Sequence, residues 1–197
     1  MAKAATRSRP VQVEAAGALP VLSSTVIDSP VGDLLAVATA DALTLLEFHD
    51  RRALAREMRD IERQFGAAAP APEPTTDAHP VFDPLRAQLG EYFAAKRGVF
   101  EIPLDIRGSA WERSVWDQLL RIPCGQTRSY EDIAIALERP GAQRAVGMAN
   151  GRNRIAILVP CHRVIQKNGE LRGYGGGLHR KAYLLELERS IAGSSLW

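Results

Sequence analysis

The sequence is poor in cysteine, with two among its 197 residues, Cys124 and Cys161. Neither belongs to a paired-cysteine motif, and His49 and His79 have no cysteine near them, which argues against a disulfide framework and a zinc site. Long apolar runs are also missing: none approaches the about 18 residues of a membrane-spanning helix, and the first residues lack the apolar core of a signal peptide. We therefore expect a cytoplasmic protein with reduced thiols that binds no metal, no cofactor and no membrane.

Acidic residues are absent between Arg139 and Gly169, a stretch that carries six basic side chains. From residue 109 onward the chain has 13 Lys and Arg against 8 Asp and Glu, whereas residues 1–108 have 12 against 15. A basic stretch in a chain of net charge +2 indicates an anionic partner, of which a phosphate backbone is the commonest. A solvated basic face without a partner would produce the same pattern.

The composition is that of a globular protein, with 46% apolar and 24% charged residues. This content supplies enough apolar surface for a sizeable core, which excludes disorder throughout the chain. The length suits one medium domain or two small ones. We predict a flexible arm at 1–20, an N-terminal α/β domain at 21–105 that contains a linker at 67–80, and a C-terminal domain at 106–197.

The first half of the chain combines short apolar segments with turn residues. The segments at 25–27, 34–38 and 43–48 predict strands joined as a hairpin or a meander. Apolar residues at helical spacing predict two helices, at 52–65 and 84–96.

The second half is dominated by helix signals. Ser109 and Glu112 form a capping-box pattern, which opens a helix that carries an apolar stripe and ends before Pro123. Two further short helices follow, one starting at Ser129 and one spanning 141–149. Joined by a turn that contains proline and glycine, they would form a helix-turn-helix.

The second helix of this pair lies in the acid-free stretch and is made mostly of small residues, including Ala142, Ala145, Gly147 and Ala149. It is the candidate recognition helix, because small side chains allow its backbone to approach a surface closely. The same residues would also suit a helix packed tightly inside the protein. The charge of Arg144 argues against complete burial.

One cysteine stands in a setting that suggests reactivity. The β-branched apolar run at 155–159 predicts a buried strand, and Cys161 follows it, with His162 and Arg163 directly after. Because the thiolate is the nucleophile and a free thiol is mostly protonated at neutral pH, an imidazole and a positive charge nearby would activate it. An inert core cysteine is the alternative, since neighbours in sequence need not be neighbours in space.

These residues resemble the active-site signature of the O6-alkylguanine-DNA alkyltransferases, also called methylated-DNA-protein-cysteine methyltransferases. The signature is the segment PCHRVI from Pro160 to Ile165, followed by a glycine-rich loop around Tyr174. The resemblance is strong over residues 84–188 and weaker before them. Further segments that follow the family pattern in order are 100–105, 115–116, 122–130, 144–147 and 181–188.

The resemblance implies DNA repair by direct reversal. An alkyl group would pass from O6-alkylguanine in duplex DNA, with O4-alkylthymine as a further substrate, to Cys161 in one irreversible transfer that consumes the protein. His162 matches the imidazole that deprotonates the thiol through a water molecule, and Glu188 matches the carboxylate that orients this imidazole. Asn153 matches the asparagine that bonds within the active-site turn.

The resemblance also implies a flipped base, because a thiol inside the protein cannot reach an atom within the base stack. Arg144 would fill the gap in the duplex, and Tyr130 would press on the neighbouring phosphate. Tyr174 would donate a hydrogen bond toward O6, the backbone of Val159 would read the base, and Gly175 would lie in the pocket. The residues expected to contact the minor groove are Ala142, Gln143, Ala145, Gly147 and Arg152.

Three sites depart from the family pattern, the first of which is the run 110–112, where a small, aromatic, glutamine run is commoner. Arg154 stands where many members have proline, so the loop would be less rigid and an additional charge would lie near DNA. Gly175 stands where some relatives carry a side chain, so the triple glycine at 175–177 would be mobile and tolerant of bulky alkyl groups.

Two other functions compete with alkyl transfer. A DNA-binding sensor or regulator would keep the fold without the chemistry, but such relatives replace the cysteine, whereas this chain keeps Cys161, His162 and Glu188. A conventional thiol hydrolase would need an oxyanion hole and a substrate cleft, and nothing in the sequence indicates either. We therefore expect an α/β (α+β) protein with a strand-rich N-terminal portion and a helical C-terminal portion, acting as a monomer on duplex DNA.

Overall fold

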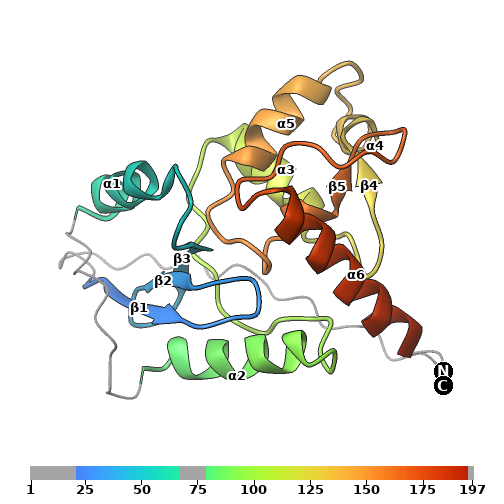
Figure 1. The fold of residues 1–197 in the computed structure, drawn as a ribbon. Helices are drawn as coiled ribbons and strands as arrows, with labels where there is room; N and C mark the ends of the chain where they lie inside the picture. The colour runs from blue at the N-terminus through green and yellow to red at the C-terminus, as the bar shows by residue number, and fades with distance from the viewer. Residues whose placement is uncertain (1–20, 67–78, 195–197) are drawn as a thin grey trace, which may run out of the picture.

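The computed structural model describes residues 21–66 and 79–194 (Figure 1). The predicted arm at 1–20 and most of the predicted linker at 67–80 lie outside these residues. The N-terminal portion of the described chain holds a sheet and two helices, and the C-terminal portion is mainly helical. The fold class predicted from the sequence is confirmed.

Three antiparallel strands form the sheet, in the order β1 (Ser23–Ile27), β2 (Leu34–Ala38) and β3 (Leu43–Phe48). The turn between β1 and β2 contains Gly32 at a φ of 95°, a conformation that favours glycine. Every residue of β2 and β3 is buried, because both faces of the sheet are covered. The predicted meander is confirmed.

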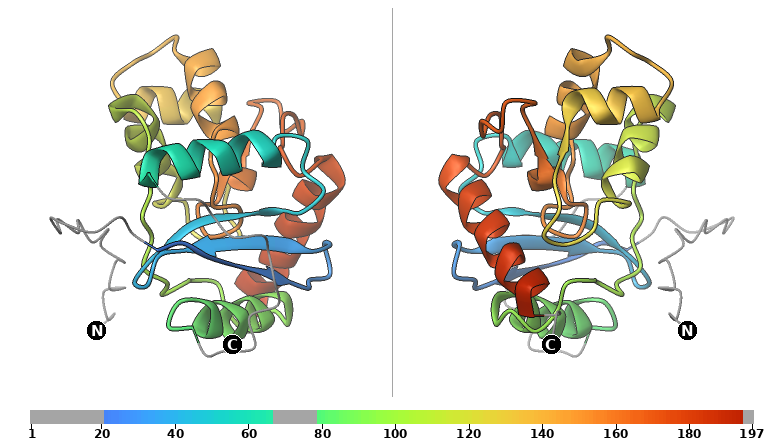
Figure 2. Two further views of the ribbon diagram at one scale, coloured as in Figure 1. Left: turned by 90° about the vertical axis from the view of Figure 1, so that its left-hand side faces the viewer. Right: turned by 90° about the vertical axis from the view of Figure 1, so that its right-hand side faces the viewer.

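Helices α1 (Leu54–Phe65) and α2 (Phe82–Phe93) pack on opposite faces of this sheet (Figure 2). The alternation of side chains along β2 explains how this happens. Leu35 and Val37 join Ile61 of α1 in one apolar cluster, whereas the other residues of β2 face the main core together with α2. Both predicted helices are confirmed.

The C-terminal portion arranges its helices around a short parallel pair of strands, β4 (Arg128–Ser129) and β5 (Val164–Ile165). The turn that carries the signature cysteine is a short 3-10 helix, η1 (Cys161–Arg163). The α-helices are α3 (Ala110–Leu119), α4 (Tyr130–Ala136), α5 (Gln143–Gly151) and α6 (Leu178–Ser194).

Capping boxes fix the starts of α3 and α4. The Ser109 hydroxyl accepts from the Glu112 N–H, and the Glu112 carboxylate accepts in return from the Ser109 N–H at 2.8 Å. Ser129 and Asp132 repeat this arrangement at α4. The predicted box at Ser109 is confirmed, because side-chain caps depend on local sequence alone.

The turn between α4 and α5 uses two residues with positive φ, Glu138 at 56° and Gly141 at 90°. The helices that it joins contact each other, and α3 lies against α5. The indole N–H of Trp116 in α3 donates to the Ala149 carbonyl at 2.8 Å. This contact orients α5, so that one of its faces points into the protein and the other outward.

The predicted strand at 155–159 is wrong. Residues there form turns, and Ile157 has a φ of 69°, while Ile155 makes an isolated bridge with Leu46 of β3. The Asn153 side chain supplies the hydrogen bonds that a strand partner would otherwise give, by accepting from the Ile155 N–H and donating to the Val159 carbonyl. A β-branched apolar run therefore forms a buried turn here.

One apolar core joins the two portions of the molecule. It includes Leu46 and Tyr92 from the N-terminal portion and Val115, Ile155 and Leu184 from the C-terminal portion. Within residues 21–66 and 79–194, no helix is long and apolar enough to cross a membrane.

Candidate active site

Cys161 begins η1 and is 7% exposed, in the core that joins the two portions. The Asn153 Nδ2 atom lies 3.2 Å from the Cys161 Sγ atom. The same amide donates to the Val159 carbonyl at 2.8 Å, and its oxygen accepts from the Ile155 N–H at 3.0 Å. Asn153 therefore both shapes the turn and contacts the thiol.

Burial raises the pKa of the Cys161 thiol to about 11, although the hydrogen bond from Asn153 acts in the opposite direction. The thiol is consequently protonated at neutral pH. For Cys161 to act as a nucleophile, a base has to remove this proton.

His162 is fully buried, and its Nε2 atom lies 2.8 Å from Glu188 Oε1. Because a carboxylate accepts hydrogen bonds, Nε2 carries the proton and Nδ1 keeps a free lone pair. Nδ1 is buried and has no hydrogen-bond partner among the described residues. Burial lowers the pKa of His162 below its ordinary value, which keeps the imidazole neutral and able to accept a proton.

Glu188 is held as a carboxylate by several donors. Arg163 donates from Nε to Oε2 at 2.8 Å and from Nη2 to Oε1 at 2.9 Å, and the Tyr92 hydroxyl donates to Oε1 at 2.9 Å. Burial alone would favour the neutral acid, but the hydrogen bonds from His162 and Arg163, together with the charge of Arg163, lower the pKa of Glu188 to about 2. The fold thus brings Glu188 to His162, the residue that directly follows Cys161 in the chain.

Two of these partners of Glu188 are not predicted by the sequence. Tyr92 belongs to the apolar stripe of α2, where the pattern indicates only a core residue. A tyrosine in such a stripe is nevertheless a usable signal, because a buried hydroxyl needs a hydrogen-bond partner. Arg163 is expected beside the thiol as an activating charge, but its guanidinium binds Glu188 instead.

Lys181 is a further residue that the sequence does not single out. Its ammonium group donates to the Val164 carbonyl at 2.6 Å and to the Arg172 carbonyl at 3.0 Å, and burial lowers its pKa to about 8. Lys181 therefore ties α6 to β5 and to the start of the glycine-rich loop.

The loop at 173–177 lies against the N-terminal portion. The ring of Tyr174 packs edge-on against Phe48, with 6.0 Å between ring centroids, and its buried hydroxyl has no partner among the described residues. Gly176 is buried, and the Phe48 ring occupies the space where a side chain at this position would lie. A glycine is therefore required at position 176 by close packing against Phe48, whereas the sequence suggested a mobile loop.

Tyr130 and Arg144 lie at the outer side of the C-terminal portion. The Tyr130 hydroxyl lies 3.4 Å from the Arg172 carbonyl, and a Cβ atom on Gly147 of α5 would lie 3.8 Å from the Tyr130 ring. Tyr130 thus sits between α5 and the glycine-rich loop. Arg144 is exposed near the start of α5.

The exposure of α5 differs between its two faces. Val146, Ala149 and Asn150 are buried, whereas Arg144 and Met148 are exposed, which excludes a helix packed entirely inside the protein. The remaining residues predicted to contact DNA are half-buried, except for the exposed Arg152; they are Ala142, Gln143, Ala145 and Gly147.

Acids from other elements neutralise most cations of the acid-free stretch. Arg154, expected near DNA, instead points toward α1 and is 18% exposed. Arg139 and Arg144 are exposed and form no ion pair within the described ranges. The ion pairs are Arg152 with Glu112, Arg154 with Asp60, Arg163 with Glu188 and Lys167 with Glu131.

The backbone of Val159 is used within the turn itself. Its N–H donates to the Ile155 carbonyl at 3.0 Å, and its carbonyl accepts from the Cys161 N–H and from Asn153 at 2.8 Å each. Both lone pairs of this carbonyl are engaged. The backbone of Val159 therefore contributes to the shape of the turn before Cys161.

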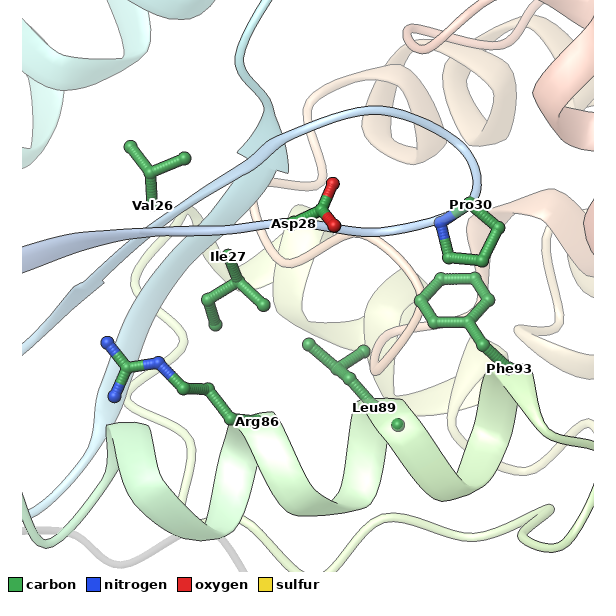
Figure 3. A pocket seen from close by; sticks show the side chains of 8 residues that line it. Val26, Ile27, Asp28, Pro30, Arg86, Leu89 and Phe93 are labelled. Carbon is green, nitrogen blue, oxygen red and sulfur yellow. The ribbon is translucent and has the colours of Figure 1, made fainter. Parts of the chain in front are cut away.

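A hollow lined by both apolar and charged residues lies between β1 and α2, on another part of the molecule (Figure 3). Leu89 and Phe93 of α2 face Ile27 and Pro30 across it, and none of the predicted site residues lines it. The described residues contain no group of three His, Cys, Asp or Glu that could hold a metal ion.

Comparisons with known proteins cover both portions of the chain. One family model, described as 6-O-methylguanine DNA methyltransferase, ribonuclease-like domain, matches residues 22–106. A second, described as 6-O-methylguanine DNA methyltransferase, DNA binding domain, matches residues 110–190.

Similar proteins and structures agree with these models. The methylated-DNA-protein-cysteine methyltransferase of Mycobacterium tuberculosis is 44% identical over 170 residues, which are 86% of this chain and 94% of that protein. The one from Methanosarcina barkeri is 38% identical over 165 residues, or 84% of this chain and 96% of that protein. The crystal structure of the Mycobacterium tuberculosis O6-methylguanine methyltransferase matches with a TM-score of 0.71 at 41% identity, covering 87% of this chain and 94% of that chain. A structure of OGT from the same organism in complex with DNA also has a TM-score of 0.71 at 41% identity, covering 86% and 94%. The chain therefore belongs to the family of methylated-DNA-protein-cysteine methyltransferases, enzymes that repair DNA by alkyl transfer.

Proposed function

We propose that the chain repairs O6-alkylguanine in duplex DNA by moving the alkyl group to Cys161 in a single irreversible turnover. The observation that carries this proposal is the buried set of Cys161, His162 and Glu188, in which the carboxylate holds one imidazole nitrogen and leaves the other free to accept a proton. O4-alkylthymine is a second proposed substrate, because its alkyl group is likewise bonded to an exocyclic ring oxygen.

The proposed transfer begins with the proton of the thiol and ends with the restored base. His162 Nδ1 takes the Cys161 proton through a water molecule, and the sulfur attacks the alkyl carbon as the bond from that carbon to O6 breaks. The electron pair of the broken bond passes to guanine, toward whose O6 atom Tyr174 donates a hydrogen bond. The proton taken from Cys161 passes on from His162 to the guanine ring, so the products are S-alkylcysteine and unmodified guanine. Asn153 positions the sulfur during this step.

The base leaves the duplex to reach a buried thiol, at a cost of a few kcal/mol of unstacking. We assign α4 and α5 to a helix-turn-helix whose second helix enters the minor groove, where readout is largely independent of sequence. The exposed Arg144 fills the gap left by the base, and Tyr130 presses on the adjacent phosphate. The small residues of α5 support close approach to DNA, with Gly175 in the pocket.

We further propose two domains, a monomeric state and a reducing compartment for this chain. Residues 21–105 form an N-terminal domain, and residues 106–197 form the domain for DNA binding and transfer. The chain acts as a monomer, because the groups of the relay all come from one copy. The free thiols of Cys124 and Cys161 suit a reducing compartment such as the cytoplasm.

The proposal is tested by intact mass measurement and peptide mapping after incubation with duplex DNA that contains O6-methylguanine. We expect the mass of one methylene group to be added to the peptide that contains Cys161, with no further turnover. Cys161→Ser should gain nothing, whereas Cys124→Ser, which removes the other thiol, should react like the wild type. If the protein binds this DNA but its mass stays constant, the chain is a sensor of damage and the proposed chemistry is wrong.

A further inference from the structure

A set of buried charges lies in the N-terminal portion, outside the proposed relay. Arg51 Nη1 is 2.6 Å from Glu47 Oε1, and Arg51 Nη2 is 2.8 Å from Glu57 Oε1. The side chains of Arg51, Glu47 and Glu57 are 8%, 1% and 3% exposed. Two carboxylates on one planar guanidinium fix both its position and its orientation. We call these three residues the Arg51 cluster.

The fixed guanidinium contacts two segments of the C-terminal portion. Arg51 Nη2 donates to the Gly151 carbonyl at 3.0 Å, at the end of α5. Its Cζ atom also lies where a side chain at position 175 would begin, 2.6 Å from the Cβ atom that an alanine would place there. Gly175 has no positive φ, so its backbone would accept an alanine and only the guanidinium opposes one.

Both contacted segments border the Cys161 site. Gly151 follows Asn150, whose side-chain amide donates to the Cys161 carbonyl at 3.3 Å. Gly175 follows Tyr174, whose buried hydroxyl has no partner among the described residues. The Arg51 cluster is also near enough to influence the pKa of the Cys161 thiol, which Glu47 raises and Arg51 lowers.

We propose that Arg51 is a positioning residue that limits the size of the alkyl group accepted by Cys161. Its guanidinium sets the distance between the end of α5 and the glycine-rich loop, and it occupies the volume beside Gly175. This inference rests on the proposed alkyl transfer. Arg51 takes no part in the proton relay, because both its Nη atoms are bound to the two glutamates and to Gly151.

The test is a double-mutant cycle between Arg51→Lys and Gly175→Ala. Lysine keeps the positive charge that the two glutamates need but removes the planar guanidinium from beside Gly175. Rate constants for labelling of Cys161 are measured with duplex DNA containing O6-methylguanine and with duplex DNA containing O6-benzylguanine. Arg52→Ala is the matched control, since Arg52 is the neighbouring cation and is exposed.

In the wild-type background we expect Gly175→Ala to slow the reaction about tenfold, because the guanidinium has to move. In the Arg51→Lys background the same change should lower the rate constant by less than about threefold. The effects of two substitutions depend on each other when the residues are in contact, and Arg51→Lys removes this contact. Arg51→Lys alone should raise the ratio of the benzyl rate to the methyl rate by about fivefold, as expected when a pocket gains room. Arg52→Ala should leave both rates and their ratio unchanged.

Equal costs of Gly175→Ala in the two backgrounds would overturn the inference, as would an unchanged benzyl-to-methyl ratio in Arg51→Lys. A purely structural role would lower both rates together with the melting temperature and leave the ratio constant. Gly175→Ala alone provides a second test that removes no charged group: narrowing of the pocket should lower the ratio by about fivefold. Failure of the proposed function is distinct, because the wild type itself would then not be labelled by either DNA.

Discussion

Burial keeps two side chains of the candidate site, Cys161 and His162, uncharged. It raises the pKa of the Cys161 thiol to about 11 and lowers the pKa of His162 below 6.5. A neutral thiol and a neutral imidazole are the correct starting states for a proton transfer from sulfur to nitrogen. In the proposed transfer, Glu188, whose pKa is lowered to about 2, would supply the negative charge that stabilises the imidazolium.

The lowered pKa of His162 leads to a specific pH dependence. With free O6-benzylguanine as substrate, the rate constant should stay level as the pH falls from neutral to 6.5 and decline only below that value, where acid begins to protonate the imidazole. The unfolded chain takes up this proton more readily than the folded one, so stability present above pH 6.5 is also lost in acid. Melting curves at each pH separate the two effects. A decline centred above pH 6.5 in a folded protein would contradict the assignment of His162 as the base.

Site residues that belong to a recognisable motif can be predicted from the sequence. Residues whose role depends on contacts with distant partners are much harder to predict. Cys161, His162 and Glu188 are recognisable from a motif, but the charges of Arg51 and Glu57 look like ordinary helix-surface charges. Glu57 did leave a signal: it lies four and eight residues before the buried Ile61 and Phe65, on the apolar side of α1. A carboxylate in that stripe indicates a buried ion pair, although its partner cannot be read from spacing.

Among the elements, α5 combines rigidity with an exposed face. The Trp111 and Trp116 indoles of α3 donate to the carbonyls of Ala145 and Ala149. These hydrogen bonds fix α5 against α3. The same helix carries the exposed Arg144. A helix fixed in this way can hold a long side chain against a duplex without moving itself.

Arg144→Ala should therefore slow repair of duplex DNA by about tenfold or more, because nothing replaces the extruded base. The reaction with free O6-benzylguanine should be unchanged, since a free base needs no extrusion. Both rates are followed by labelling of Cys161. Arg139→Ala is the matched control, because it removes a similarly exposed cation from the turn before α5. Equal losses on duplex and free base would rule out the role proposed for Arg144.

Elements whose signals are local are predicted correctly, and an element stabilised by a distant side chain is not. The cap at Ser109 depends on a serine and a glutamate three residues apart. The turn at 155–159 depends on Asn153 and on a bridge to Leu46, more than one hundred positions earlier. Nothing in the apolar run itself distinguishes this turn from a strand.

At the scale of the whole molecule, the N-terminal portion takes part in the site. Tyr92 of α2 binds Glu188, and Phe48 of β3 packs on Tyr174. Arg180 of α6 contacts the N-terminal portion in turn: its guanidinium lies over the Phe48 ring and forms an ion pair with Asp50 at 2.7 Å. The two portions therefore share one core and one site, which the predicted division into domains does not convey.

Because the thiol lies within this shared core, the adduct should lower the stability of the whole protein. A new group on Cys161 enters a packed turn, and overpacking costs about 1 to 3 kcal/mol. For a protein of this length, the melting temperature should fall by about 2 to 10 °C. Calorimetry before and after complete reaction with O6-benzylguanine measures the change, with Cys161→Ser exposed to the same reagent as a control. An unchanged or raised melting temperature in the reacted protein would show that the site accepts the adduct without strain.

The segment at 153–156, which precedes the thiol, also covers the free edge of β3. The Leu46 N–H donates to the Arg154 carbonyl at 2.8 Å, and the Leu46 carbonyl accepts from the Ala156 N–H at 2.7 Å. An uncovered strand edge is a template on which other chains can pair and aggregate. Because Asn153 of the same segment contacts the Cys161 sulfur, an alkylated molecule in which this segment has loosened should aggregate sooner than an unreacted one.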